Sequence, residues 1–264
     1  MYNLLKFELY KLKYNTVFKI STIITLFLTF LVLKLFYSHL DIIVIFSFIH
    51  GHETFGFFIN KFHNIFTPTA LEFFKSSFGF SVILIILSLF LVGSYIINEY
   101  SYGTVKNTLS YGHSRSKIYL SKIIIIYLSI FILLILLLFL PLAAALILGW
   151  VKSISAYTAV KIFKYTLLTY LILITLASAY TCLATIIKSK SIIIALGMIL
   201  LFVNAGGFLI NLKFDIYTPI IMLMKLGSLN SSPSDICNVI SICTIIILVS
   251  LGLGIITFKN QDIK

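Results

Sequence analysis

Long apolar runs, separated by shorter polar stretches, set the pattern of this chain from about residue 17 to residue 258. A helix needs about 20 residues to cross a hydrocarbon core of about 30 Å, and six of the runs have the length and apolar content of a span. The pattern therefore predicts an all-α, polytopic integral membrane protein with six transmembrane helices in a single domain, residues 1–264. The predicted spans are residues 17–37, 78–97, 118–149, 163–187, 192–210 and 239–258.

Residues 2–16 precede the first span and predict an amphipathic helix. Leu5, Leu9 and Leu12 lie on one helical side, with Lys13 at its edge. Such a helix suits the surface of a membrane better than its interior. We therefore expect an N-terminal interfacial helix that leads into the first span.

Three of the spans and loops carry features that predict local structure. The third apolar run is too long for a straight crossing, and Pro141 should kink or end it near the far interface. Trp150 then fits that interface.

Small residues in 177–185 favour close helix packing, with the lining of a pathway as an alternative. Residues 211–238, interrupted by Pro219, suit a short re-entrant or interfacial hairpin.

Composition leads to the same class of protein. The chain is 60% apolar and 11% charged, has a mean hydropathy of +1.11, and contains 24 Phe and 15 Tyr. A water-soluble domain of this length cannot bury so much apolar surface, so most of it must face lipid or other helices. Cys182, Cys237 and Cys243 have no metal-binding spacing, and their odd number argues against a disulfide framework.

The basic character of the chain has two interpretations. A net charge of +12 is compatible with nucleic-acid binding, but the basic residues are scattered between apolar runs and form no nucleic-acid motif. An anionic lipid bilayer is the simpler partner, and we expect no nucleic acid.

Residues 38–76 predict a mixed, aromatic-rich loop outside the membrane. The histidines there raise the possibility of a metal site. No second pair of ligands accompanies them, so an ordinary loop is the favoured interpretation and no metal is expected. The residues considered are His39, His50, His52, Glu53 and His63.

The same loop contains a near match to a phosphate-binding loop, from Gly51 to Gly56. Phe57 and Phe58 follow where that motif requires Lys and Ser or Thr. No cofactor is therefore expected, and the chain does not have the motif for binding ATP itself. An energised transporter built on this chain would need a separate ATPase subunit.

Residues 98–122 form the longest predicted polar stretch between spans on one side of the membrane. Gly103 predicts a turn, Val105 and Leu109 lie one helical turn apart in a short amphipathic piece, and Gly112 breaks that piece. Ser114 can then cap the next helix. A plain solvated loop is the alternative interpretation.

The order of residues in this stretch resembles the first cytoplasmic loop of bacterial ABC transporter permeases of the ABC-2 type. In those permeases a glutamate, a Gly-Thr pair, a short helix, a Ser-Arg pair and a lysine recur in this order. The resemblance implies a short cytoplasmic coupling helix, two copies of an ABC ATPase subunit and a second permease subunit, identical or paralogous. The implied ATPase-coupling residues are Glu99, Gly103, Thr104, Val105, Leu109, Ser114, Arg115, Lys117 and Lys122.

Two further expectations concern this loop and its side of the membrane. Glu99 and Arg115 carry opposite charges that could meet and hold the two stems of the loop together. Twelve of the 20 Lys and Arg residues fall on the side of residues 98–122 and of both termini. By the positive-inside rule, that side is the cytoplasm. The resemblance to bacterial permeases implies that the membrane is a bacterial plasma membrane.

The function implied by the resemblance is that of a permease subunit, not an enzyme, working with ATP hydrolysed elsewhere. No Asp, Glu, Arg or His is expected at mid-depth, which disfavours an ion-coupled carrier and favours an amphipathic substrate such as an antimicrobial peptide, a drug or a lipid-like molecule. Family members suggest export or self-protection, as in bacteriocin immunity. The alternative is a membrane immunity protein or channel that works without an ATPase.

Overall fold

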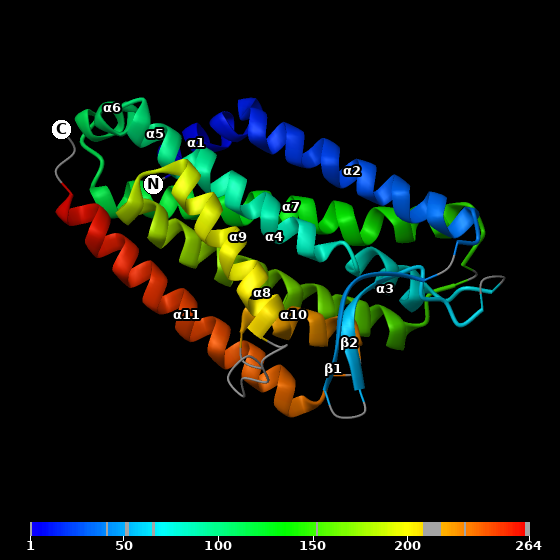
Figure 1. Cartoon of the computed structure of the whole chain (residues 1–264). Coiled ribbons are helices and arrows are strands. Elements are labelled where there is room, and N and C mark those ends of the chain that lie inside the picture. Colours follow the sequence, from blue (N-terminus) through cyan, green and yellow to red (C-terminus); the bar gives the residue numbers. More distant parts are fainter. Residues whose placement is uncertain are drawn as a thin grey trace.

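The computed structural model describes residues 2–40, 42–50, 53–64, 67–151, 153–207, 218–229 and 231–261. Within these ranges it describes the backbone alone at 48–50, 53–54, 105–107 and 202–207. The chain folds into an elongated bundle of long helices with one β-hairpin against its side (Figure 1). We call the end that holds α5 and α6 the α6 end, and the opposite one the α3 end.

Helices make up most of the described chain, as the apolar pattern predicts. The helices are α1 (Tyr2–Tyr14), α2 (Thr16–Tyr37), α3 (Ala70–Phe78), α4 (Ser81–Val92), a π-helical turn η1 (Gly93–Ile97), α5 (Asn98–Ser101), α6 (Thr104–Ser110), α7 (Arg115–Ile147), α8 (Ala156–Ile187), α9 (Lys190–Gly207), α10 (Pro219–Gly227) and α11 (Pro233–Asn260). The strands are β1 (Ile43–His50) and β2 (Glu53–Ile59). The all-α class is confirmed, with the hairpin as a local exception.

Five helical segments in the described chain are long and apolar enough to cross a membrane. They are α2, the continuous segment Ser81–Ser101, α7, α8 and α11. The predicted span 192–210 corresponds to α9, of which the shorter stretch Lys190–Leu201 is apolar and fully described. The end of that predicted span lies outside the described residues. A count of six spans therefore stays a prediction.

The prediction of a mixed, aromatic-rich loop over residues 38–76 was wrong in secondary structure, because the stretch contains two strands and most of α3. β1 and β2 pair antiparallel, with Ser47 opposite Gly56. Phe57 and Ile59 are buried at 0% and 1% exposure, and Phe58 between them is half-buried, as in a strand that packs one face against the bundle. α3 then begins with a capping box between Thr69 and Glu72, a standard helix start.

Aromatic rings hold the α3 end of the bundle together. The ring centroid of Phe36 lies 4.7 Å from that of Phe73 and 4.9 Å from that of Trp150, and Phe62 is 5.1 Å from Phe36. Offset and edge-on ring pairs at such distances are favourable beyond the area they bury. Trp150 therefore joins α2 to α3 just after the end of α7.

The two prolines and the small residues that the sequence singles out have different structural roles. α7 continues through Pro141 to Ile147, so this proline does not end the helix. Pro219 stands at the first turn of α10, where its missing N–H costs nothing. Ala177, Ser178 and Thr181 of α8 are fully buried within this chain, as expected for close helix packing.

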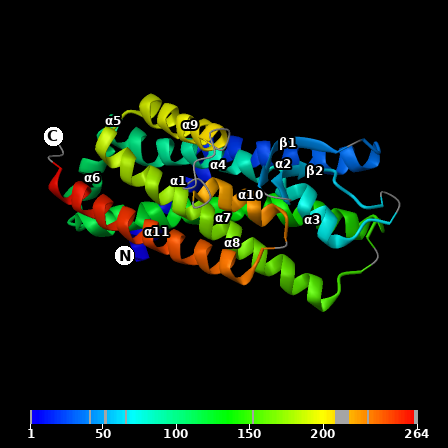
Figure 2. The same cartoon turned by 60° about the horizontal axis from the view of Figure 1, so that its bottom comes forward.

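Both termini lie toward the α6 end, a placement on which the two views agree (Figure 2). α11 runs beside α7 and α8 and reaches this end at Asn260. Gly254 of α11 faces Tyr119 of α7 so closely that a Cβ at residue 254 would overlap the tyrosine ring. A glycine is thus needed for the two helices to approach at this level.

Candidate functional site

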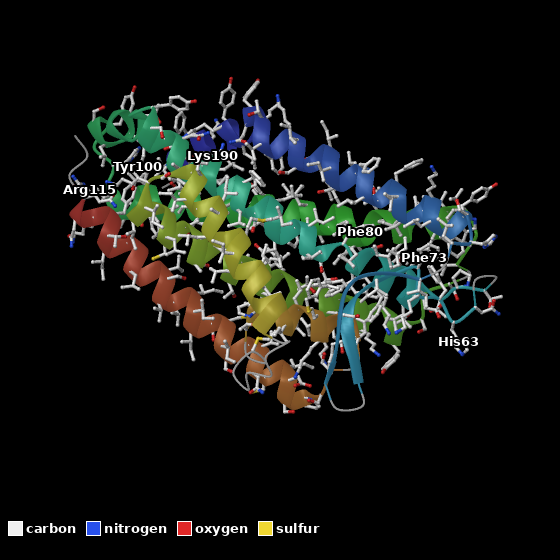
Figure 3. All side chains as sticks on the ribbon, viewed as in Figure 1. His63, Phe73, Phe80, Tyr100, Arg115 and Lys190 are labelled. Carbon is white, nitrogen blue, oxygen red and sulfur yellow. The ribbon has the colours of Figure 1, made fainter. Side chains whose placement is uncertain are left out.

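The polar stretch 98–122 lies at one end of the bundle. Tyr100 and Arg115 mark this end, while His63 and Phe73 lie at the other (Figure 3). Gly103 adopts a left-handed conformation with φ of 65° between α5 and α6, and Gly112, with φ of 79°, follows the end of α6. Both turns fall where the glycines predicted them, because such backbone conformations are unfavourable for residues with a Cβ.

A π-helical turn directly precedes Glu99. η1 covers Gly93–Ile97 and is buried on all sides. A π turn adds one residue to a helical turn, which rotates the following residues by roughly 100° relative to a regular α-helix. Asn15, which caps the start of α2, donates from its Nδ2 to Ser94 Oγ of this turn at 3.3 Å. The turn is therefore tied to the junction of α1 and α2, and it sets the direction in which Glu99 points.

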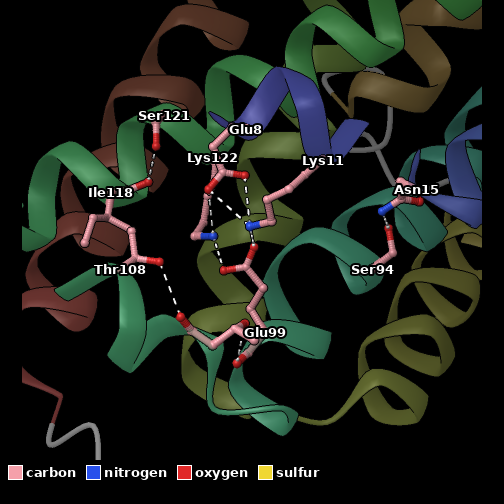
Figure 4. Close-up of polar contacts among 10 residues, drawn as sticks. Glu8, Lys11, Asn15, Ser94, Glu99, Thr108, Ile118, Ser121 and Lys122 are labelled. Atoms are coloured by element: carbon pink, nitrogen blue, oxygen red, sulfur yellow. Dashed lines mark hydrogen bonds and ion pairs between the residues drawn. The ribbon is translucent and has the colours of Figure 1, made fainter. Parts of the chain in front are cut away.

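Glu99 belongs to a buried cluster of four charged residues, which we call the ionic cluster: Glu8, Lys11, Glu99 and Lys122 (Figure 4). The two carboxylate oxygens of Glu99 accept hydrogen bonds from Lys11 and from Lys122 respectively. Glu8 completes the ring, since its carboxylate lies 3.3 Å from Lys122 Nζ and 3.3 Å from Lys11 Nζ. Two carboxylates therefore meet two ammonium groups, and the cluster is neutral as a whole.

Burial makes the ionic cluster energetically important. Glu8 is 0% exposed, Lys122 2% and Glu99 6%. Removing one member of such a buried pair costs about 3–5 kcal/mol, because it leaves an uncompensated charge away from water. Burial lowers the pKa of Lys11, but the carboxylates of Glu99 and Glu8 together raise it above the ordinary 10.5. Lys11 thus stays charged at neutral pH, and the cluster joins α1, α5 and α7.

Arg115 does not pair with Glu99, so the expected ion pair across the loop was wrong. Its Nη1 instead donates to the backbone carbonyl of Lys259 at 2.7 Å and to that of Gln261. These carbonyls lie at the end of α11, where a cation also interacts favourably with the helix dipole. Arg115 therefore ties the start of α7 to the end of α11, and Lys122, about two turns further along α7, partners Glu99.

The other residues predicted for coupling occupy α6 and the start of α7. Thr104 begins α6, and its hydroxyl donates to the Glu99 carbonyl at 3.4 Å. Ser114 stands at the N-cap position of α7 without a capping hydrogen bond from its side chain, and Lys117 is exposed. Leu109 is half-buried against residues of α1, α7 and α11. The side chain of Val105 lies outside the described residues. Of the apolar ridge predicted for Val105 and Leu109, the structure therefore describes only the Leu109 side chain.

A groove runs between α1 and α6 on the outside of the ionic cluster. It has a volume of about 310 Å³ and a mostly apolar lining that includes Leu4, Phe7, Thr108 and His113. Tyr111 lines the groove and is 81% exposed, and Tyr102 at the other end of α6 is 78% exposed. Exposed aromatic side chains beside an apolar groove are typical of protein-binding surfaces.

Sequence reasoning missed two of the four cluster residues, Glu8 and Lys11. The signal was present, because Glu8 is the acidic residue in an otherwise basic N-terminal helix. The metal hypothesis gains no support, since no group of three metal-ligating side chains occurs among the residues that the structure describes. His50, His52 and Glu53, on which that hypothesis rested, have side chains outside the described ones.

Taken together, the long apolar helices and the neutralised charges at one end define a multi-pass α-helical membrane protein with a built polar site at a helix-bundle end. Comparison with protein families matches residues 4–204 to a family described as ABC-2 family transporter protein. The match covers most of the chain, so this protein belongs to that family, and it is of the type that forms the membrane subunit of an ABC transporter. Comparison with curated proteins gives no match.

Proposed function

We propose that this permease exports an amphipathic substrate with ATP hydrolysed by a separate ATPase subunit that docks at the α6 end. The observation that carries the proposal is the ionic cluster directly behind α6. It joins α1, α5 and α7 through side chains that are almost fully buried. A displacement of α6 would therefore move α1, α5 and α7 together. Of these, α5 and α7 belong to long apolar segments.

The surface of α6 supports a docking role. Tyr102 and Tyr111 flank the helix and are largely exposed, and the groove beside Tyr111 can accept an apolar side chain from a partner. Leu109 contributes from the half-buried side of the same helix. In the proposed assembly, two ATPase subunits bind beneath two permease subunits, identical or paralogous, and α6 lies in the cytoplasm with both termini.

The buried charges support an amphipathic substrate. In the part of the chain that the structure describes, the buried ionisable Glu, Asp, Lys and Arg residues are Glu8, Glu99 and Lys122, and all three belong to the ionic cluster. A carrier that moves ions usually has such groups within the membrane-spanning core. The proposed setting is a bacterial plasma membrane.

Recovery of the ATPase with a tagged permease tests the proposal. The ATPase subunit that co-purifies with the wild-type permease should be lost from the double variant Tyr102→Asp/Tyr111→Asp, because charge opposes burial of this surface in an interface. The matched control is Tyr37→Asp, an exposed tyrosine at the other end of the molecule, which should keep the ATPase. Recovery of no ATPase with the wild type would instead favour a channel or immunity protein.

A further inference from the structure

A second cavity lies at the α3 end, on the far side of the molecule from the ionic cluster. It has a volume of about 420 Å³ and is formed where β2 and the segment after it meet α3 and the end of α10. Its lining combines two lysines with aromatic rings. The residues that matter for the argument are Phe58, Lys61, Phe62, Glu72, Lys75 and Phe78.

Glu72 lines this cavity but forms no ion pair with Lys61 or Lys75. Its Oε1 accepts from the backbone N–H of His63 at 2.9 Å. Its Oε2 accepts from the backbone N–H of Thr69 at 2.7 Å and from the Thr69 hydroxyl at 2.9 Å. Among the described residues, neither Lys61 nor Lys75 forms an ion pair. Both carboxylate oxygens of Glu72 thus accept hydrogen bonds at the start of α3. With two lysines and one carboxylate in its lining, the cavity keeps an excess of positive charge.

The electrostatics of Lys75 show the effect of this excess. Burial lowers the pKa of Lys75, and the neighbouring charges of Lys161 and Lys61 lower it further, against a smaller opposing effect of Glu72. Repulsion between like charges and loss of hydration both disfavour the protonated amine. An anion bound beside the two lysines would offset both effects, because it attracts the protonated amines.

The aromatic rings provide a second kind of contact in the same cavity. Lys61 Nζ lies 4.3 Å from the centroid of the Phe58 ring, a geometry that holds the ammonium group over the apolar wall. Phe62 and Phe78 line the cavity as well. Cations and apolar rings that share one concave site match a ligand with an anionic head and an apolar tail.

We propose that this cavity binds an anionic amphiphile, with its phosphate or carboxylate head between Lys61 and Lys75 and its apolar tail along Phe58, Phe62 and Phe78. The ligand reaches the site either from solution or as an anionic lipid of the bilayer. Cationic amphiphiles are excluded by the same charges. The site is a property of the permease alone, so it stands apart from the proposed ATPase.

Binding to the purified, full-length permease in a neutral detergent tests the proposal in solution. Hexyl phosphate should bind in a calorimetric titration, while hexan-1-ol, which has the same tail, should bind at least about tenfold more weakly. In Lys61→Gln/Lys75→Gln the affinity for hexyl phosphate should fall about tenfold or more. Lys34→Gln is the matched control, since Lys34 is exposed in α2 and does not line the cavity.

A second arm places the same variants in phosphatidylcholine nanodiscs that contain phosphatidylglycerol. Native mass spectrometry then counts the phosphatidylglycerol molecules retained by the protein. Loss of retained lipid in Lys61→Gln/Lys75→Gln, with none in Lys34→Gln, supports the site and assigns its ligand to the bilayer. Lys75→Arg keeps the charge and should retain binding. The proposal is overturned if neither arm shows binding that depends on Lys61 and Lys75.

Discussion

The two ends of the molecule treat their charges in opposite ways. At the α6 end, Lys122 is almost fully buried and contacts the carboxylates of both Glu8 and Glu99. At the α3 end, Lys75 is half-buried beside other lysines, and the nearest carboxylate, that of Glu72, is held by backbone and hydroxyl donors. Neutralised charges join helices rigidly, whereas charges left without a counter-ion are available to a ligand.

This difference teaches that a lysine's role follows from its surroundings and not from its place on the outside of an apolar run. By sequence, Lys75 and Lys122 look alike, since each stands close to the end of a long apolar helix. Burial with two carboxylates makes one a structural residue. Burial next to like charges makes the other a candidate contact for an anion.

The largest expected effect is at the ionic cluster. Glu99→Ala removes the carboxylate that contacts both lysines, and it should lower the free energy of unfolding by about 3–5 kcal/mol, because Lys122 is left buried without its closest partner. Glu99→Ala/Lys122→Met should be more stable than Glu99→Ala, since the remaining Glu8 and Lys11 are a neutral pair 3.3 Å apart. Thermal unfolding in detergent measures both. Equal stability of the wild type and Glu99→Ala would contradict a buried cluster.

A smaller effect is expected at the turn between α5 and α6. Gly103→Ala should cost about 1–2 kcal/mol, because an L-residue with a Cβ disfavours the left-handed backbone that this turn requires. No heavy atom lies within 4 Å of the place that the new Cβ would occupy, so the cost is conformational and not steric. Co-purification of the ATPase should fall together with stability. A variant as stable as the wild type would show that the turn adopts another conformation.

Arg115→Ala should have an effect of about 1 kcal/mol. It removes the donor to the last carbonyls of α11, and a cation at a helix C-terminus contributes about 0.3–1 kcal/mol. Hydrogen exchange should accelerate at the end of α11 and remain unchanged in α5, because Arg115 does not contact Glu99. Faster exchange in α5 would restore the pairing with Glu99 that the structure contradicts.

The smallest effect is expected from Lys75→Gln, and its sign is opposite to the others. Since the pKa of Lys75 is lowered, the folded protein holds this proton less tightly than the unfolded chain does. The penalty is full below the lowered pKa and disappears as the pH rises to the ordinary 10.5. Lys75→Gln should therefore raise stability at pH 7 by less than about 1 kcal/mol. Thermal unfolding at neutral and alkaline pH checks this, and destabilisation at pH 7 would contradict it.

Much of the fold could be predicted from hydrophobic length, because a membrane fixes how long an apolar helix must be. The turns at Gly103 and Gly112 were equally predictable, since glycine is favoured where φ is positive. The ionic cluster was not, because Lys11 and Glu99 are 88 residues apart in the chain. The hairpin was less predictable, because Phe55, Gly56 and Phe57 are buried one after another, without the alternation that indicates a strand with one exposed face.

We propose that an ATPase subunit binds the α6 end and not the α3 end. A photo-reactive amino acid placed at Tyr111 tests this most directly, with the same amino acid at Tyr37 as the control, since both side chains are largely exposed, at 81% and 73%. Irradiation of cells should yield a covalent product between the permease and an ATPase subunit from position 111 and none from position 37. A product from position 37 alone, or none from either, would contradict the claim.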